Sequence, residues 1–391
     1  MAISRAIAPL TTAKLQIEVF LLRYLLLSLL LISSSIVFAQ ELHTFSNGEV
    51  ADAEKINENF EQLNLRLESF ESQLISEEIN VDCSNNPKAL SEVQDQINSG
   101  ESIFRVTLKG ACDLRYLSIN KGRVYLDGGM SEGQCDEQQA VISQEVGSPY
   151  GFIAVSSGAY ILFSCLTFQG NYFLLTATTN GTMVMGKGVE SVNAETFYVD
   201  VLSDGVLYSA YPPKIDSLTA DQGTIKLIAA RQPIDIAYLE LNQSDFLCVY
   251  CNGAVDSTSL SGGSRATYEL ADPSKFGSGY VQSPRLFVNN LSLKGSIVDI
   301  KTPDYVTTTG EPIPVEAVFN GVTAWANSTI TIDPLHAGSE VHNIQFANMG
   351  LRSGSVAVVE NCDWPFTNSV TLNDSAELYL VRAGGFPCSP N

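Results

Sequence analysis

The side chains best suited to acid–base chemistry are few in this chain. Only three histidines occur, His43, His336 and His342, and no Gly-x-Ser-x-Gly segment supplies the nucleophile turn of a serine hydrolase. Carboxylates are more frequent, and glycosidases place two of them across the bond that they cleave. The pairs that stand close in sequence are Asp200 with Asp204 and Asp216 with Asp221. In an all-β fold such pairs are more often solvated surface charges, so we expect no catalytic residue.

The same carboxylates suggest bound calcium as an alternative to a chain without a metal ion. Calcium prefers carboxylate and carbonyl oxygens, but overall acidity specifies no site, so we expect no resident metal or cofactor. Cys248-Val-Tyr-Cys251 has the C-x-x-C spacing of zinc and redox sites. No βαβ pattern surrounds it and no second pair accompanies it. A structural disulfide or two buried thiols are therefore favoured over zinc or redox chemistry.

Cysteine usage points to an oxidising compartment. The eight cysteines form an even set that permits 105 full pairings. We favour a Cys83–Cys112 disulfide at the start of the chain's main body, and place Cys362–Cys388 at its other end as a second candidate. Disulfides persist mainly in exported proteins.

The first residues resemble an export signal. A basic region that ends at Arg23 precedes the apolar segment 24–38, and Val37 and Ala39 place small or modest residues at positions −3 and −1 of a cleavage site. We expect cleavage between Ala39 and Gln40, which makes residues 1–39 a signal peptide. An uncleaved membrane anchor is the alternative, although the apolar segment is shorter than the roughly 20 residues that span a bilayer. No transmembrane domain is expected after cleavage, so the protein would be secreted or lie on the cell surface.

Net charge excludes one class of partner. The chain has 22 basic and 43 acidic residues. Removal of residues 1–39, which contain three basic residues and Glu18, leaves 19 and 42, a net charge near −23. Because phosphate binding needs a cationic surface, we expect no nucleic acid partner.

A heptad pattern follows the signal within residues 40–80. Apolar residues recur at steps of four and three, as in the a/d seam of a coiled coil. They are Ile56, Phe60, Leu63, Leu67, Phe70 and Leu74. Three heptads are marginal alone, so the helix either packs on the body or self-associates; bulky phenylalanines at a and d favour a trimeric neck over a tight dimer.

The residues around the start of this helix carry a resemblance. Segment 43–60, HTFSNGEVADAEKINENF, has an Asn-Gly turn and an Asn-x-Asn-Phe helix start. It resembles a segment of bacterial exported and phage-tail-like proteins, where it leads into a short coiled coil. The resemblance implies a trimerising or attachment module and implies no reaction.

Residues 81–391 have the pattern of an all-β body. A short amphipathic helix at 89–97 precedes an alternating strand at 104–108, and short strands follow at 117–119 and 124–126. This order resembles the start of right-handed parallel β-helix proteins of the pectate-lyase-like type, in which an N-terminal helix caps the open end of the solenoid.

Later segments continue the alternation. Two apolar residues stand two apart in 165–170, 290–295 and 343–348. At roughly 20–25 residues per rung, residues 116–391 would form about 11–13 rungs. One or two β-sandwiches would also satisfy the short strands. We expect the Ser- and Gly-rich stretch Asp256–Gly279 to be a loop.

The resemblance adds no catalytic motif. Polygalacturonases carry Asn-Thr-Asp, Asp-Asp, Gly-His-Gly and Arg-x-Lys segments, which are missing here, and neither Arg231 nor Arg265 stands in a lyase motif. We therefore expect a secreted or surface-exposed, non-enzymatic β-helix protein with an adhesive or glycan-contacting role. The alternative is a polysaccharide lyase or glycoside hydrolase that acts on an acidic polysaccharide, because fold alone does not decide function.

Overall fold

The computed structural model describes eleven stretches of the chain, all within one compact unit, Ser69–Asn391. They are residues 77–99, 102–131, 134–136, 139–192, 196–229, 232–270, 285–302, 316–334, 343–359, 370–382 and 386–387. The signal, the heptad residues Ile56–Leu74, the three histidines, Arg231, Cys362 and Cys388 lie outside them. The predictions made for those residues stay predictions.

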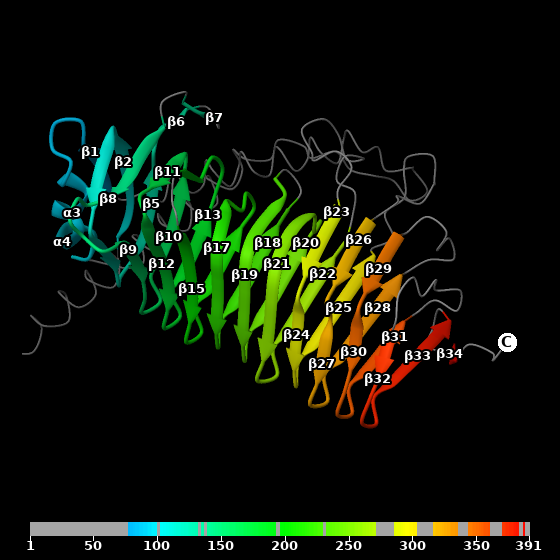
Figure 1. Ribbon diagram of the computed structural model, residues 1–391. Coiled ribbons are helices and arrows are strands. Elements are labelled where there is room, and N and C mark those ends of the chain that lie inside the picture. Colours follow the sequence, from blue (N-terminus) through cyan, green and yellow to red (C-terminus); the bar gives the residue numbers. More distant parts are fainter. Residues whose placement is uncertain are drawn as a thin grey trace, which may run out of the picture. The chain divides into compact units, whose positions relative to one another are not determined.

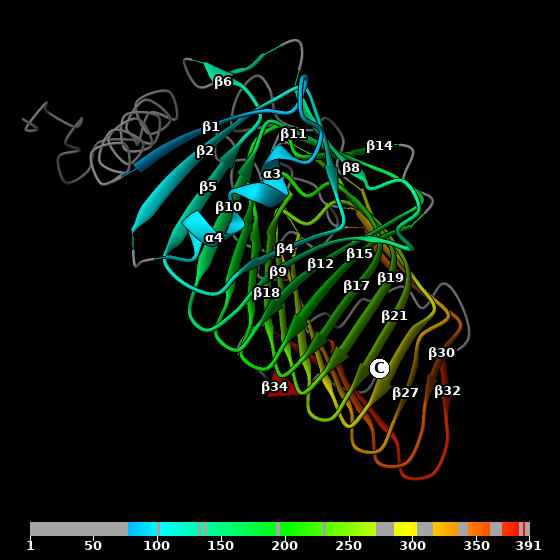
Figure 2. The same cartoon turned by 90° about the vertical axis from the view of Figure 1, so that its left-hand side faces the viewer.

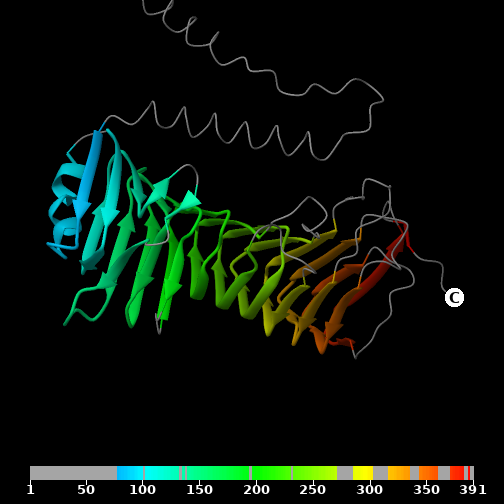
Figure 3. The same ribbon diagram turned by 90° about the horizontal axis from the view of Figure 1, so that it is seen from above.

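The described strands wind into a solenoid whose rungs follow one another in chain order (Figure 1; Figure 3). Sheet A contains β1 (Glu77–Asp82), β2 (Ile103–Lys109), β5 (Arg123–Asp127), β10 (Tyr160–Ser164), β13 (Thr182–Met185), β16 (Val206–Ser209), β18 (Thr224–Ile228), β20 (Asp245–Val249), β22 (Arg265–Glu269), β25 (Ile297–Thr302), β28 (Thr329–Pro334), β31 (Val356–Val359), β33 (Glu377–Arg382) and β34 (Phe386–Pro387). Each strand from β1 to β33 pairs in parallel with the next.

Sheet C forms a second wall of the same rungs. Its main path contains β4 (Tyr116–Ile119), β9 (Gly151–Val155), β12 (Tyr172–Thr178), β15 (Thr196–Leu202), β17 (Lys214–Asp221), β19 (Ile234–Asn242), β21 (Gly253–Ser261), β24 (Leu291–Lys294), β27 (Thr323–Trp325), β30 (Met349–Leu351) and β32 (Val370–Leu372). A branch contains β23 (Arg285–Asn289), β26 (Glu316–Asn320) and β29 (Asn343–Ala347). The smaller sheet B contains β3 (Ala111–Leu114), β8 (Ala140–Gln144), β11 (Leu166–Gln169) and β14 (Glu190–Val192).

This topology confirms the parallel β-helix and excludes the sandwich alternative for the described residues. Consecutive strands of a sandwich pair in antiparallel hairpins, whereas here each pairs with its equivalent one rung away. Side chains at every second position point into the solenoid and are buried, as Phe104, Val106 and Leu108 of β2 illustrate.

Two short helices close the N-terminal end, α3 (Ala89–Glu92) and α4 (Gln94–Ile97) (Figure 2). Leu90 and Ile97 are fully buried against the first rungs. Gln94 Oε1 accepts the Ser118 amide at 2.9 Å, and Asn98 Nδ2 donates to the Ser118 carbonyl at 2.6 Å. β4 is the edge strand of sheet C, so its backbone amides and carbonyls would otherwise be free to pair with another strand. The side chains of Gln94 and Asn98 form hydrogen bonds with two of these groups.

A column of small residues lines the corner where each rung turns from sheet C into sheet A. Its members each precede a sheet A strand: Gly181, Gly205, Gly223, Ser244, Ser264, Ser296, Ser328 and Ser355. At Gly205 a Cβ would lie 2.3 Å from the Ala177 carbonyl oxygen, so this rung requires glycine. In the next rungs Ser264 Oγ donates to the Ser261 carbonyl at 2.6 Å and accepts the Ser244 amide at 3.2 Å. Buried hydroxyls thus join neighbouring rungs.

The described residues contain three disulfides. Cys83 and Cys112 form the bond favoured from the sequence, and Cys248 is bonded to Cys251. The third joins Cys135 to Cys165, a pair that the sequence did not suggest. Three disulfides indicate an oxidising location outside the cytoplasm.

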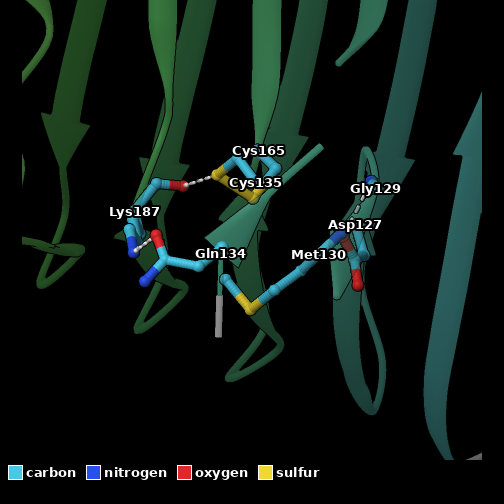
Figure 4. The surroundings of a disulfide bond; sticks show 7 residues. All are labelled: Asp127, Gly129, Met130, Gln134, Cys135, Cys165 and Lys187. Atoms are coloured by element: carbon cyan, nitrogen blue, oxygen red, sulfur yellow. Dashed lines mark hydrogen bonds between the residues drawn. A yellow bond between two sulfur atoms is a disulfide. The ribbon is translucent and has the colours of Figure 1, made fainter. Parts of the chain in front are cut away.

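The Cys135–Cys165 disulfide holds a small hairpin, β6 (Met130–Ser131) and β7 (Gln134–Cys135), against the solenoid (Figure 4). Asp127 Oδ1 accepts the amides of Gly129 and Met130 at 3.0 and 2.8 Å, which fixes the start of the hairpin. Lys187 Nζ donates to Gln134 Oε1 at 2.7 Å. The hairpin is therefore attached through both ends.

Two sequence expectations need adjustment. The body already begins with β1 at Glu77, before the expected boundary at residue 81. The predicted loop Asp256–Gly279 is wrong in its first half, where β21 and β22 lie. Serine is common there because it occupies the outward face and the corner of regular rungs. No helix within the described ranges has the length and hydropathy that a membrane crossing requires.

Candidate functional site

The outer face of sheet C carries a ladder of aromatic rings. Strand alternation turns one set of side chains outward while their neighbours, such as Leu117, Phe173 and Phe197, are fully buried. The register places the outward positions of neighbouring strands side by side. Tyr116 is paired with Phe152, Phe152 with Leu174, and Leu174 with Tyr198. The members of this aromatic ladder are Tyr116, Tyr150, Phe152, Tyr172, Tyr198 and Tyr238.

Most of these rings are in direct contact. The Tyr116 and Phe152 rings are stacked with centroids 5.3 Å apart, and Tyr150 lies edge-on to Phe152 at 6.3 Å. Tyr150 and Tyr172 are 6.5 Å apart, and Tyr172 and Tyr198 are 4.8 Å apart. Such geometries stabilise aromatic pairs by about 0.5–1.5 kcal/mol. The five rings from Tyr116 to Tyr198 therefore form a continuous, pre-ordered surface, and Tyr238 lies two strands further along, beyond Ser217.

The ladder is open to solvent at one end and half-buried further along. Tyr116 and Tyr150 are 45% and 44% exposed. Desolvation raises the pKa of Tyr172, with further contributions from Tyr198 and Asp200. Burial likewise raises the pKa of Tyr238, helped by its hydrogen bond to a neighbouring carboxylate. Both hydroxyls are therefore neutral at physiological pH and can donate a hydrogen bond.

A line of carboxylates lies beside the rings. Asp200 follows Tyr198 on the same face of β15, and its Oδ1 accepts the Thr219 hydroxyl at 2.5 Å. The Tyr238 hydroxyl donates to Glu240 Oε2 at 3.1 Å. Asp200 is paired with Thr219 on the neighbouring strand, and Thr219 is paired with Glu240 on the strand after it. The carboxylates are thus held in register with the ladder.

Two more carboxylates support the same strands. Asp216 Oδ2 accepts the Phe197 amide at 2.6 Å, and Asp221 Oδ1 accepts Asn242 Nδ2 at 2.8 Å. At Asp216 and Ser217 of β17 two consecutive side chains are only partly buried, and β19 has the same break in alternation at Ala237 and Tyr238, so the register between the two strands is unchanged. These contacts brace the strands that hold the ladder.

The ion pairs of the described residues lie elsewhere. Their acidic members are Glu145, Asp299 and Glu316, paired with Lys88, Arg265 and Arg285. None of the carboxylates beside the ladder has a cationic side chain as partner within the described part of the chain. Sheet C thus presents negative charge to solvent next to its aromatic rings.

The residues considered for catalysis do not converge. Asp204 lies in the turn after β15 with a positive φ of 63°, whereas Asp200 faces outward from the strand. Arg265 pairs with Asp299 on sheet A, at 2.6 Å. Among the described residues no group of three or more His, Cys, Asp or Glu side chains could hold a metal ion.

Sequence reasoning missed the aromatic ladder. Its signal is an aromatic residue at the outward position of an alternating strand, as in Tyr-Phe of β12, Phe-Tyr of β15 and Ala-Tyr-Leu-Glu of β19. Because the rung length varies, the sequence alone does not align these positions. The pairing of strands supplies that alignment.

Comparison with known proteins adds no relative. No protein-family model matches the chain, and neither the curated proteins nor the solved structures contain a significant match. The interpretation of the aromatic ladder therefore rests on its own chemistry.

Proposed function

We propose that this is an exported, non-enzymatic protein whose solenoid binds a glycan along the aromatic ladder of sheet C. The observation that supports it is a run of contacting outward rings on β9, β12 and β15 that begins at Tyr116 of β4 and is followed by Tyr238 of β19, with donors and acceptors beside them. Pyranose rings pack their apolar C–H faces against aromatic rings, while their hydroxyls need polar partners. The ladder provides flat rings, and Tyr238, Thr219 and Asp200 provide the polar partners.

The solenoid gives such a site its length. From β4 to β19 the ladder crosses six strands of sheet C, and five intervals of about 4.8 Å extend it over roughly 24 Å. An extended chain laid across the strands would contact a new rung with each sugar. Affinity is then expected to rise with glycan length until the ladder is covered, and to level off beyond it.

Oligomerisation through the neck fits the same proposal. A single ladder exposed to water gives modest affinity, and three linked copies would raise the avidity for a polymeric ligand through effective concentration. The three disulfides of the described body and the predicted signal peptide support a secreted or surface location. A bacterial adhesin-like role follows from these features together.

The test is a glycan-binding screen of the purified protein beside two ring variants. Tyr172→Ala and Tyr198→Ala remove central rings, and each should weaken binding several-fold. Tyr208→Ala is the matched control, because Tyr208 is a half-buried outward residue of β16 on sheet A. Equal binding by all four proteins would refute the ladder as the site. Release of new sugar ends during the assay would instead favour a lyase or hydrolase.

A further inference from the structure

The walls of the solenoid differ sharply in charge. Strands β12, β15, β17, β19 and β21 of sheet C contain six acidic residues and one basic residue, Lys214. Strands β13, β16, β18, β20 and β22 of sheet A, which follow them in the same rungs, contain two of each. The acidic residues of sheet C are Asp200, Asp216, Asp221, Asp235, Glu240 and Asp256. The overall acidity of the chain therefore does not explain the contrast, because both walls come from the same rungs.

We infer that the ligand of the aromatic ladder is a glycan that carries free amino groups. The inference rests on the proposed glycan-binding function and names the class of glycan. A protonated amine has three donors, and carboxylates are its strongest acceptors in proteins. The face of a tyrosine ring attracts the same cation within about 6 Å of its centroid. Rings and carboxylates beside one another thus favour the same group.

The positions of Asp200 and Glu240 suit this role. Each lies on the outer face two residues beyond the outward tyrosine of its own strand, Tyr198 or Tyr238, which is the next outward position. Asp200 is half-buried and Glu240 is exposed, and each carboxylate is held by one hydroxyl, that of Thr219 or Tyr238. A carboxylate has about four acceptor sites, so most of its capacity stays open to a ligand. An acidic polysaccharide would meet like charges along this line.

A matched pair of ligands tests the inference. At a pH below the pKa of the glucosamine amine, oligomers of glucosamine and of N-acetylglucosamine share one backbone and differ in the charge of the nitrogen. Titration calorimetry at low salt should show the glucosamine oligomer binding about tenfold more tightly than its acetylated counterpart. The ratio should fall toward one near 1 M salt, where the Debye length is about 3 Å.

Charge variants locate the effect. Asp200→Asn and Glu240→Gln should each lower the affinity for the glucosamine oligomer about two- to fivefold, and lower that for the acetylated oligomer by a clearly smaller factor. Asp245→Asn on sheet A is the control, because Asp245 is an exposed carboxylate of the opposite wall. Circular dichroism spectra establish that the variants are folded.

The outcomes separate this inference from the proposed function. Tyrosine-dependent binding of both oligomers with equal affinity would overturn the amine preference and leave the glycan site in place. Binding of neither oligomer, nor of any glycan in the screen, would overturn both. Polylysine that binds as tightly as the glucosamine oligomer, and equally well to the Tyr172→Ala protein, would show an unspecific charge effect and also overturn the inference.

Discussion

The Cys83–Cys112 disulfide offers the sharpest test of how the solenoid is stabilised. It closes a separation of 29 residues, from the first strand across both cap helices to β3. In the chain-entropy description, closing a loop of that length raises the free energy of the unfolded chain by about 3.6 kcal/mol and stabilises the folded state by the same amount. The Cys248–Cys251 disulfide closes a separation of only 3 residues, for which the same relation gives about 1.6 kcal/mol. The two bonds should therefore differ by about 2 kcal/mol.

The two pairs are well matched for a comparison. Cys83 and Cys112 are 2% and 0% exposed, and Cys248 and Cys251 are 0% and 3% exposed. Replacing either pair with alanine removes two sulfur atoms from comparable environments, so the packing terms largely cancel. What remains is the difference in loop length. Terminal rungs also fray more readily than central ones, which adds to the loss for the Cys83–Cys112 pair.

The assay is guanidinium unfolding of the parent and of the two double-alanine proteins, followed by circular dichroism. Mass mapping of the parent under non-reducing conditions first establishes that both bonds are present. Hydrogen exchange should show faster opening in residues 83–114 only in the Cys83→Ala, Cys112→Ala protein. Equal losses of stability in the two variants, or a larger loss for the Cys248–Cys251 pair, would refute loop closure as the main contribution.

Three further changes test separate parts of the molecule. Ser264→Ala should lower the free energy of unfolding by about 1–3 kcal/mol, because it leaves a buried amide of the preceding rung without an acceptor; unchanged stability in denaturant would contradict the serine column. Tyr268→Phe should leave stability unchanged or raise it by about 1 kcal/mol, since the buried Tyr268 hydroxyl makes no well-formed hydrogen bond, although the Thr258 hydroxyl lies near it. A loss of stability on thermal denaturation would show that the two hydroxyls satisfy one another. Leu63→Asp with Leu67→Asp should convert the expected trimer into a monomer with a folded body; light scattering that gives the parent the same mass would reject the neck.

The cap and the first rungs could be predicted because their signals are local. Alternation at 103–109 and the amphipathic segment 89–97 each depend on residues within a few positions of one another. The Cys83–Cys112 pair lies within the same region. Cys135–Cys165 escaped prediction because it joins a hairpin insertion to a later rung, and no local pattern marks that contact.

The sequence shows no constant rung period because the turns between strands vary in length. One feature of the sequence nevertheless marks where each sheet A strand begins. Equivalent sheet A positions are 18 residues apart between Val206 and Thr224, and 32 apart between Ile297 and Thr329. The constant feature is a small residue directly before each of these strands, such as Gly205 or Ser328. It is constant because the corner between the walls has room for little else, as the contact of a Cβ at Gly205 shows.

The same regularity explains why the aromatic ladder exists only in the folded chain. Phe152 and Tyr198 are 46 residues apart in sequence, yet only Leu174 separates them in the register of sheet C. Beyond β19 the outward positions change to Ser257, Ser259 and Ser292, so the ladder ends while the solenoid continues. Rings are therefore not needed for the fold at these outward positions. Outward rings also occur at Tyr208 of sheet A and at Phe287 and Trp325 of later sheet C strands. The run of ring contacts from Tyr116 to Tyr198, next to the carboxylates of sheet C, is better explained by a ligand than by stability.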